Sequence, residues 1–146
     1  MLVVERVEAL HRVDLFSAVP GRVLAAVGAT AEEVTVEAGS TFIELGAVED
    51  CLYVVVSGRV RVHRGDRTLV ELGPGSAVGE LAVLVPEPRV ASVTALEPTL
   101  LLRVNKVVLD ELLADRPELA SGVIAALASR LRASAEHADT DTPPGE

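Results

Sequence analysis

The sequence contains a single cysteine, Cys51, which excludes an internal disulfide bond and a zinc site built from several thiolates. Histidine is scarce as well. The three histidines, His11, His63 and His137, are too far apart in the chain to suggest a shared metal ion, and each is expected at the surface. We therefore predict no metal site.

Long apolar runs are also missing. The longest uninterrupted runs span only a few residues, whereas a helix that crosses a membrane needs roughly 20. The amino end does not resemble a secretory signal, because Glu5, Arg6 and Glu8 interrupt its apolar pattern. These absences predict a cytoplasmic protein that does not insert directly into a membrane.

Positive charge is in short supply. Lysine and arginine total 13 against 22 acidic residues, which gives a net charge of −9 and argues against nucleic acid as a partner. A small anionic ligand remains compatible with this balance, since it needs only one local positive site. The chain also lacks a nucleophile elbow, a Walker-type loop and a cluster of metal ligands, so we expect a binding function and not an enzyme.

The sequence does contain a three-part pattern. Residues 1–30 predict N-terminal helices, residues 31–104 a series of short strands, and residues 105–138 two C-terminal helices. The acidic, proline-containing segment 139–146 is expected to be disordered. Turns about every 8–12 residues in the middle part predict a mainly β protein with flanking α-helices, whose centre is a jelly-roll or β-roll barrel of about eight antiparallel strands.

Several residues shape the predicted C-terminal helices. Asn105 is a suitable N-cap for the first of them, and Pro117 fits the first turn of the second. Gly122 lowers the stability of a helix by about 1 kcal/mol relative to alanine, so we expect a glycine here where the helix packs closely against another segment. An apolar stripe recurs every four residues and would either pack on the β-barrel or form the interface of a homodimer: Leu119, Val123, Leu127 and Leu131.

The most informative stretch is residues 75–93, which combines glycines with charged residues at both ends of a short loop. Gly75 and Gly79 allow backbone conformations that other residues avoid, and they let a ligand approach the main chain. The segment after Gly79 can form one or two helical turns, whose free N–H groups attract a phosphate. Arg89 can add a bidentate contact to the same phosphate, and Ser92 supplies a hydroxyl.

Glu80 has the opposite chemistry, because a carboxylate cannot contact phosphate but accepts a hydrogen bond from a hydroxyl such as the ribose 2′-OH. A ligand that satisfies both Glu80 and Arg89 would carry a phosphate fused to a ribose, as a nucleotide does. The alternative is a salt bridge between Glu80 and Arg89 that merely closes a surface loop.

A resemblance to a known family covers roughly residues 14–136. Val78-Gly79-Glu80-Leu81-Ala82 followed by Pro88-Arg89-Val90-Ala91-Ser92 resembles the phosphate-binding cassette of cyclic nucleotide-binding domains, which regulatory subunits of protein kinase A, catabolite activator proteins and cyclic nucleotide-gated channels share. The region around Gly46, Tyr53 and Gly58 and the last predicted helix resemble the same family.

The resemblance implies a role for each cassette residue. Glu80 would bind the ribose 2′-OH, and Arg89 the exocyclic phosphate oxygens. The base would lie near Val62 and Val70, with the last helix as a lid, and Ser134 would reach an adenine if two chains pair as catabolite activator proteins do. The implied ligand-binding residues are Gly79, Glu80, Leu81, Ala82, Arg89, Val90, Ala91 and Ser92.

The chain departs from the family pattern at two informative positions. Val78 replaces the usual phenylalanine before Gly-Glu, which would change the packing under the loop without removing a ligand contact. Val90 stands where members that prefer cGMP often have a threonine, whose hydroxyl can meet the guanine amino group. The resemblance therefore implies cAMP as the ligand, with cGMP as the alternative, and no further cofactor.

The sequence thus predicts a cyclic nucleotide-binding regulatory domain in which ligand binding moves the C-terminal helices. One alternative is a domain that has lost ligand binding and serves as an interaction part of a larger parent protein; the presence of both Glu80 and Arg89 disfavours it. The other is the effector domain of a catabolite-activator-type transcription regulator without its DNA-binding part, since an acidic segment stands where a helix-turn-helix is expected.

Overall fold

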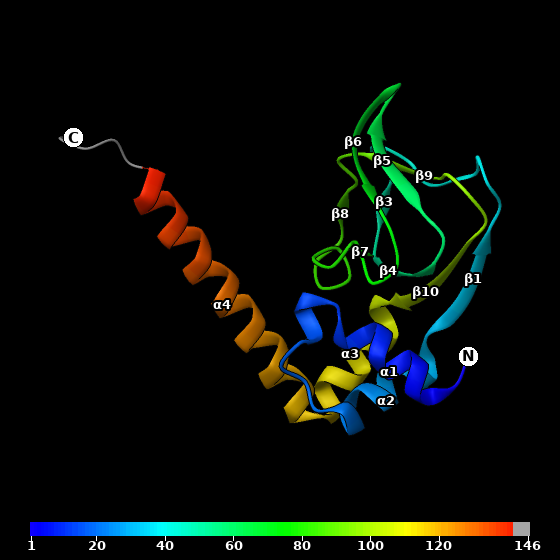
Figure 1. Ribbon diagram of the computed structural model, residues 1–146. Helices are drawn as coiled ribbons and strands as arrows, with labels where there is room; N and C mark the ends of the chain where they lie inside the picture. Colours follow the sequence, from blue (N-terminus) through cyan, green and yellow to red (C-terminus); the bar gives the residue numbers. More distant parts are fainter. Residues whose placement is uncertain (142–146) are drawn as a thin grey trace.

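The computed structural model describes the backbone of residues 1–141 and the side chains of residues 1–137. Figure 1 shows a β-roll of antiparallel strands that rests on a layer of helices, from which the last helix projects. The predicted mainly β fold with flanking helices is confirmed.

Two four-stranded antiparallel sheets form the β-roll, and a two-stranded ribbon flanks them. The first sheet has the order β1 (Glu32–Val36), β10 (Thr99–Asn105), β4 (Cys51–Ser57) and β7 (Ala77–Val78). The second has the order β2 (Thr41–Ile43), β9 (Ser92–Ala95), β5 (Val60–Arg64) and β6 (Arg67–Leu72). The ribbon pairs β3 (Val48–Glu49) with β8 (Glu87–Pro88), two short strands that the sequence did not indicate.

Strand β4 is buried on both faces, as its continuous apolar sequence predicts. Leu52 and Val54 belong to the hydrophobic cluster that the first sheet shares with the helices. Tyr53 and Val55 point the other way, into the cluster between the two sheets, where the Tyr53 ring meets Phe42 edge-on with centroids 5.4 Å apart. The first sheet is therefore the middle layer of the domain.

The helical layer consists of α1 (Val3–His11), the 3₁₀ turn η1 (Asp14–Phe16), α2 (Gly21–Thr30), α3 (Lys106–Asp115) and α4 (Pro117–Asp141). The capping prediction for α3 is confirmed, because Asn105 Oδ1 accepts a hydrogen bond from the Val108 N–H at 3.0 Å. Pro117 is the first residue of α4, as predicted. Helix α4 continues through Asp141 and so includes residues 139–141 of the segment predicted to be disordered, whereas residues 142–146 lie outside the described part.

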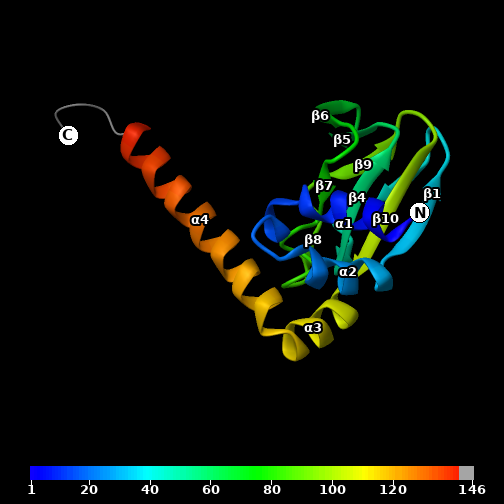
Figure 2. The ribbon, with the colours of Figure 1, turned by 60° about the horizontal axis from the view of Figure 1, so that its bottom comes forward.

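Helix α4 packs on the other helices and then leaves the domain. Its buried Leu119 and Val123 belong to the cluster that the first sheet shares with the helices. The main contacts of α4 are with η1, α3 and α2, so the buried part of the stripe faces the β-roll across the other helices. Further along, Leu127 is half-buried and Leu131 is 73% exposed. Figures 1 and 2 both show the outer half of α4 projecting away from the rest of the molecule.

One histidine is not at the surface. His63 is buried near the end of β5, which keeps its register with β9 from Val60 to His63. Its Nδ1 lies 2.8 Å from the Gly65 carbonyl oxygen and its Nε2 lies 2.7 Å from Thr94 Oγ1. The alternation of the strand places His63 on the same face as Arg61, as the sequence pattern indicates, but that pattern does not reveal the contacts with Gly65 and Thr94.

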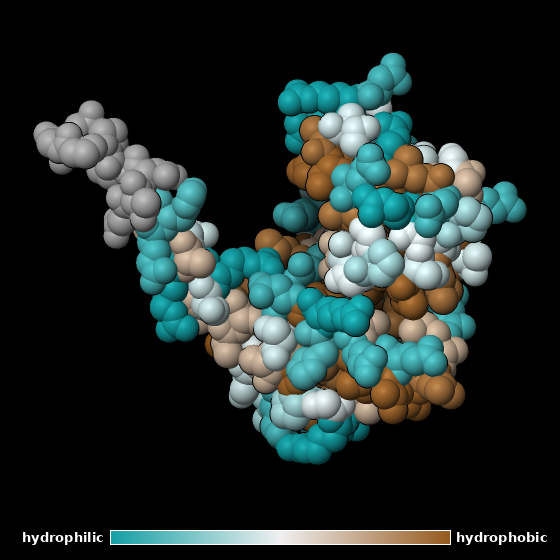
Figure 3. Space-filling view, in the orientation of Figure 1, coloured by the Kyte–Doolittle hydropathy of each residue, from teal (hydrophilic) through white to brown (hydrophobic). Residues whose placement is uncertain are grey.

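The outer surface is mostly hydrophilic at the tip of the β5–β6 hairpin, while apolar residues gather over the start of the chain (Figure 3). Leu2, Val3 and Val4 are exposed there. Within residues 1–141, none of the helices combines the length and the apolar character that crossing a membrane requires. The described residues also contain no group of three or more side chains placed to hold a metal ion.

The close approach of α4 to the loop before α2 leads to a prediction about stability. A Cβ added at Gly122 would lie 2.6 Å from Val19 Cγ2 and 3.2 Å from Val19 Cα. We expect Gly122→Ala to lower the free energy of unfolding by about 1 kcal/mol, because overpacking of about 1–3 kcal/mol outweighs the gain in helix propensity of about 1 kcal/mol. Urea denaturation followed by circular dichroism would measure this change.

Gly21→Ala in α2 is the matched control, since its added Cβ would meet Val7 at an ordinary 3.8 Å. The control should be neutral or stabilising. A stabilised Gly122→Ala variant would contradict the role of this contact.

Candidate ligand-binding site

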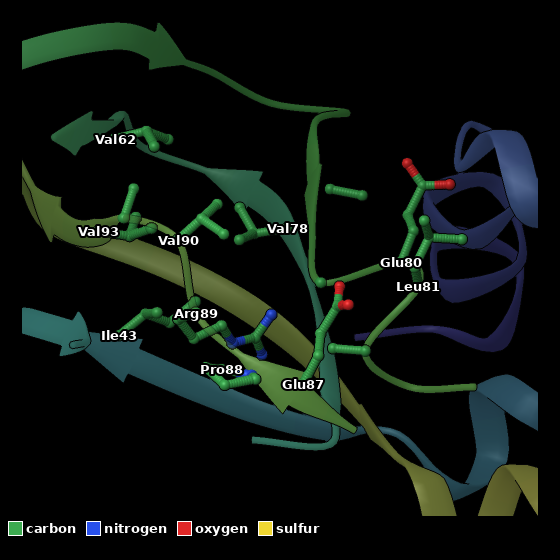
Figure 4. Close-up of a pocket in the computed structure, with 14 residues that line it drawn as sticks. Ile43, Val62, Val78, Glu80, Leu81, Glu87, Pro88, Arg89, Val90 and Val93 are labelled. Atoms are coloured by element: carbon green, nitrogen blue, oxygen red, sulfur yellow. The ribbon is translucent and has the colours of Figure 1, made fainter. Parts of the chain in front are cut away.

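A pocket of about 290 Å³ lies between the second sheet and the segment that connects β7 to β9. Ile43, Val62 and Val93 line its apolar wall, and Figure 4 shows these side chains on neighbouring strands. The opposite wall is formed by the glycine-containing turn after β7 and by the residues around Arg89. The volume is close to the lower end of the range for small-molecule sites.

Gly79 makes the turn after β7. Its φ of +86° is a conformation that glycine adopts without strain. A Cβ at this position would also lie 2.5 Å from the Cys51 carbonyl oxygen and would collide with the Arg89 guanidinium. The next residues form hydrogen-bonded turns, in which the Val83 N–H donates to the Gly79 carbonyl at 3.2 Å and the Val85 N–H to that of Leu81 at 2.9 Å.

Arg89 lies beneath this turn and is only 8% exposed. Its Nε donates to Glu49 Oε2 at 3.2 Å, and its Nη2 donates to the Cys51 carbonyl oxygen at 2.8 Å. The main chain of Arg89 is fixed as well, by hydrogen bonds to Ala47 and Gly46, both of 2.8 Å. A buried guanidinium is therefore held in one orientation at the end of an apolar pocket.

Glu80 turns away from Arg89 and towards the N-terminal helices (Figure 4). Its Oε2 accepts hydrogen bonds from the Leu15 N–H at 3.2 Å and from Arg130 Nη2 at 3.1 Å. Arg130, on α4, also pairs with Asp14 at 2.9 Å, and the carboxylates of Asp14 and Glu80 raise its pKa above the ordinary value. The alternative of a simple Glu80–Arg89 salt bridge is wrong, because each of the two residues has a different partner.

Comparison with known proteins agrees with this geometry. The sequence profile described as the cyclic nucleotide-binding domain matches residues 33–116, more than half of the chain. The chain belongs to this family. The matched residues include the predicted phosphate-binding cassette, from the turn at Gly79 to Ser92.

Among these relatives is the CRP-like cAMP-activated global transcriptional regulator of Mycobacterium tuberculosis, which is 31% identical over 130 residues. That alignment covers 86% of this chain and 58% of the regulator, so the chain spans little more than half of the regulator's length. The N-terminal domain of a transcriptional regulator from Streptomyces coelicolor superposes with a TM-score of 0.82 at 37% identity, over 86% of this chain and 94% of that one.

A second solved structure is the regulatory domain of Toxoplasma gondii PKA in a co-crystal with cAMP. It superposes with a TM-score of 0.70 at 29% identity, over 75% of this chain and 44% of that one. The fold of the cyclic nucleotide-binding domain is thus shared with proteins of quite different overall length.

The other predicted cassette residues lie around the same pocket. Leu81 and Val90 are exposed, the latter by 72%, whereas Ala82, Ala91 and Ser92 are buried. All of them except Ser92 line the pocket. Ser92 Oγ instead accepts a hydrogen bond from the Leu45 N–H at 2.9 Å, behind the pocket wall.

The three residues predicted near the base are not all together. Val62 lines the pocket, whereas Val70, its cross-strand partner on β6, is exposed and lies outside the lining. Ser134 lies in the projecting part of α4, and none of the described α4 residues lines the pocket. A contact between Ser134 and a base stays a prediction that depends on pairing of two chains.

Sequence reasoning missed the partners of the two charged cassette residues. Glu49 is 40 positions from Arg89, Arg130 is 50 positions from Glu80, and Asp14 is 116 positions from Arg130, and nothing in their local pattern marks them. It also missed two polar ties to the cassette main chain. Lys106 Nζ donates to the Leu84 carbonyl at 2.9 Å, and Arg64 Nε donates to that of Val90 at 2.9 Å.

Among the described side chains, no buried nitrogen or oxygen lacks a partner. Below the pocket, burial raises the pKa of the Cys51 thiol above its ordinary value, and the neighbouring carboxylates of Asp50 and Glu49 raise it further. Of these two carboxylates, that of Glu49 forms the ion pair with Arg89 at 3.2 Å.

Proposed function

We propose that this domain binds cAMP as a non-catalytic regulatory ligand. The observation that carries the proposal is the Arg89 guanidinium, which is buried and oriented beneath the Gly79 turn at one end of an apolar pocket. A guanidinium has five N–H donors, and the bonds to Glu49 and Cys51 engage only Nε and Nη2. Donors are left for the exocyclic oxygens of a phosphate.

Within this proposal Glu80 binds the ribose 2′-OH. Its carboxylate is attached to the same turn as the phosphate site, and Glu80 belongs to the pocket lining although its oxygens now face η1 and α4. A rotation about the side-chain bonds brings an acceptor to the ribose without moving the main chain. The cassette residues Leu81, Ala82, Val90, Ala91 and Ser92 would enclose the sugar and phosphate.

The choice of cAMP over cGMP rests on Val90 and on the relatives. Valine offers no hydroxyl for the amino group of guanine, and the pocket wall near Val62 and Val93 is apolar. The mycobacterial regulator is named for activation by cAMP, and the Toxoplasma domain was crystallised with cAMP. These observations favour adenine in the pocket.

Glu80 also supplies a route from the pocket to α4. Its present partners are the Leu15 N–H in η1 and Arg130 in α4, so binding a ribose removes an acceptor from both. Arg130 would keep only its contact to Asp14, and the docking of α4 would weaken. The ligand thereby shifts the population between two positions of the C-terminal helices, and by linkage the helices control ligand affinity.

The projecting part of α4 fits a homodimer. Ile124 and Leu131 are exposed and lie seven residues apart, the spacing of one position in a heptad repeat. Pairing of two α4 helices about a twofold axis would bury both residues and would bring Ser134 of one chain towards the pocket of the other. In a longer parent protein the same helix would connect the domain to the part that it regulates.

The phosphate assignment predicts the behaviour of an Arg89→Gln variant. We expect its affinity for cAMP to fall by at least 30-fold, because loss of a buried charged partner costs about 2–5 kcal/mol. Isothermal titration calorimetry measures the affinity, and Arg22→Gln, an exposed arginine of α2, is the control. Unchanged binding by Arg89→Gln would rule out Arg89 as the phosphate ligand.

If Glu80 exchanges Arg130 for the ribose, a substitution of Arg130 should strengthen cAMP binding, whereas the substitution of Arg89 should weaken it. We expect Arg130→Gln to bind cAMP about fivefold more tightly, because a competing contact of about 1 kcal/mol is weakened. The gain should be absent for 2′-deoxy-cAMP, which offers Glu80 no hydroxyl. The control is Arg132→Gln on the exposed surface of the same helix, and equal gains for the two ligands would contradict the exchange.

The dimer proposal is tested by sedimentation equilibrium. We expect the wild-type chain to be a dimer and the Ile124→Gln/Leu131→Gln variant a monomer, because the substitutions place amides in an apolar helix interface. Val107→Gln changes an equally exposed residue on α3 and should leave the mass unchanged. A monomeric wild-type chain at high concentration would contradict pairing through α4.

A further inference from the structure

The β3–β8 ribbon places two carboxylates beside the single guanidinium of the pocket. Glu49 and Glu87 lie directly opposite each other in the ribbon, an arrangement of like charges that is destabilising by itself. Glu49 accepts the hydrogen bond from Arg89 Nε. Glu87 is exposed, lines the pocket and is drawn beside Arg89 in Figure 4.

The charges around the phosphate end of the pocket therefore sum to a negative value. Arg89 is the one basic residue among the described lining residues, which also include Glu80 and Glu87. Glu49 already balances the charge of Arg89 at a distance of 3.2 Å.

The negative charge around this end of the pocket should repel a doubly charged phosphate more strongly than a singly charged one. A cyclic phosphodiester carries one negative charge at neutral pH and has no second proton to lose. A phosphate monoester such as 5′-AMP loses its second proton with a pKa near 6, so it carries almost two charges at pH 7. One guanidinium can offset the first charge, but the second would face Glu49 and Glu87 in partly buried surroundings, where charges are poorly screened.

We propose that Glu49 and Glu87 are specificity-determining residues, which admit the singly charged cyclic phosphodiester and repel doubly charged phosphate monoesters. The inference rests on the proposed cAMP-binding function and adds to it the basis on which the site rejects open-chain nucleotides. The repulsion does not depend on the hydrogen bond between Glu49 and Arg89. If the ligand replaces Glu49 as the partner of Arg89, the Glu49 carboxylate still lies on the β3–β8 ribbon, next to the proposed phosphate site.

The test compares two ligands on isosteric variants of the full chain. Glu49→Gln keeps an oxygen that can accept the Arg89 hydrogen bond, and Glu87→Gln keeps the size of the side chain, so both remove only charge. We expect the double variant to bind cAMP up to about threefold more tightly and 5′-AMP at least 30-fold more tightly. The ratio of the two affinities should fall about tenfold. Glu97→Gln, in the exposed β9–β10 turn, is the control for net charge.

A second arm uses the unaltered chain and varies the pH. Between pH 8 and pH 5 the monoester takes up its second proton, whereas the charge of cAMP stays constant. We expect the preference for cAMP over 5′-AMP to narrow as the pH falls, and to narrow less in the Glu49→Gln/Glu87→Gln variant. Isothermal titration calorimetry at both pH values gives the ratio of the cAMP and 5′-AMP affinities for the wild-type chain and for the double variant.

The outcomes separate this inference from the proposed function. If the wild-type chain binds cAMP but the affinity ratio is the same in the double variant, the carboxylates do not set the specificity. A preference that stays constant with pH would show that charge is not its basis. Failure of the wild-type chain to bind cAMP at all would overturn the proposed function, and the inference with it.

Discussion

Burial of strand β4 on both faces is the constraint on which the rest of the structure depends. Leu52 and Val54 anchor the helical layer, and Tyr53 and Val55 fill the space between the sheets. Burial of each such side chain contributes about 1.5–3 kcal/mol, so the strand holds three layers together through a few consecutive residues. It also positions the site, because β7 pairs with it just before Gly79 and the Cys51 carbonyl orients Arg89.

Both charged residues of the cassette have hydrogen-bond partners within the protein. Arg89 is bound by Glu49 and a main-chain carbonyl, and Glu80 by a main-chain N–H and Arg130. In the proposed function, ligand binding is therefore an exchange of partners, in which new bonds are gained and existing ones given up. The net free energy of binding would then be smaller than the contacts of the complex alone would indicate, and part of it would be passed to α4.

The sequence was a good guide wherever a local pattern determines the structure. The double burial of β4, the Asn105 cap, the Pro117 helix start and the positive φ of Gly79 all follow from short-range periodicity or residue type. Local patterns did not reveal contacts between distant segments. The burial of His63 against Thr94, the contacts of Glu49 and Arg130, and the packing of α4 on the other helices depend on tertiary structure, which leaves no trace in neighbouring residues.

The buried apolar residues of α4 lie at its start, whereas Arg130 lies eleven residues beyond Leu119. A helix rises about 1.5 Å per residue, so the contact between Arg130 and Glu80 is about 16 Å along the helix from that buried anchor. A small rotation at the anchored end would therefore displace the projecting end by a much larger distance, as in a lever.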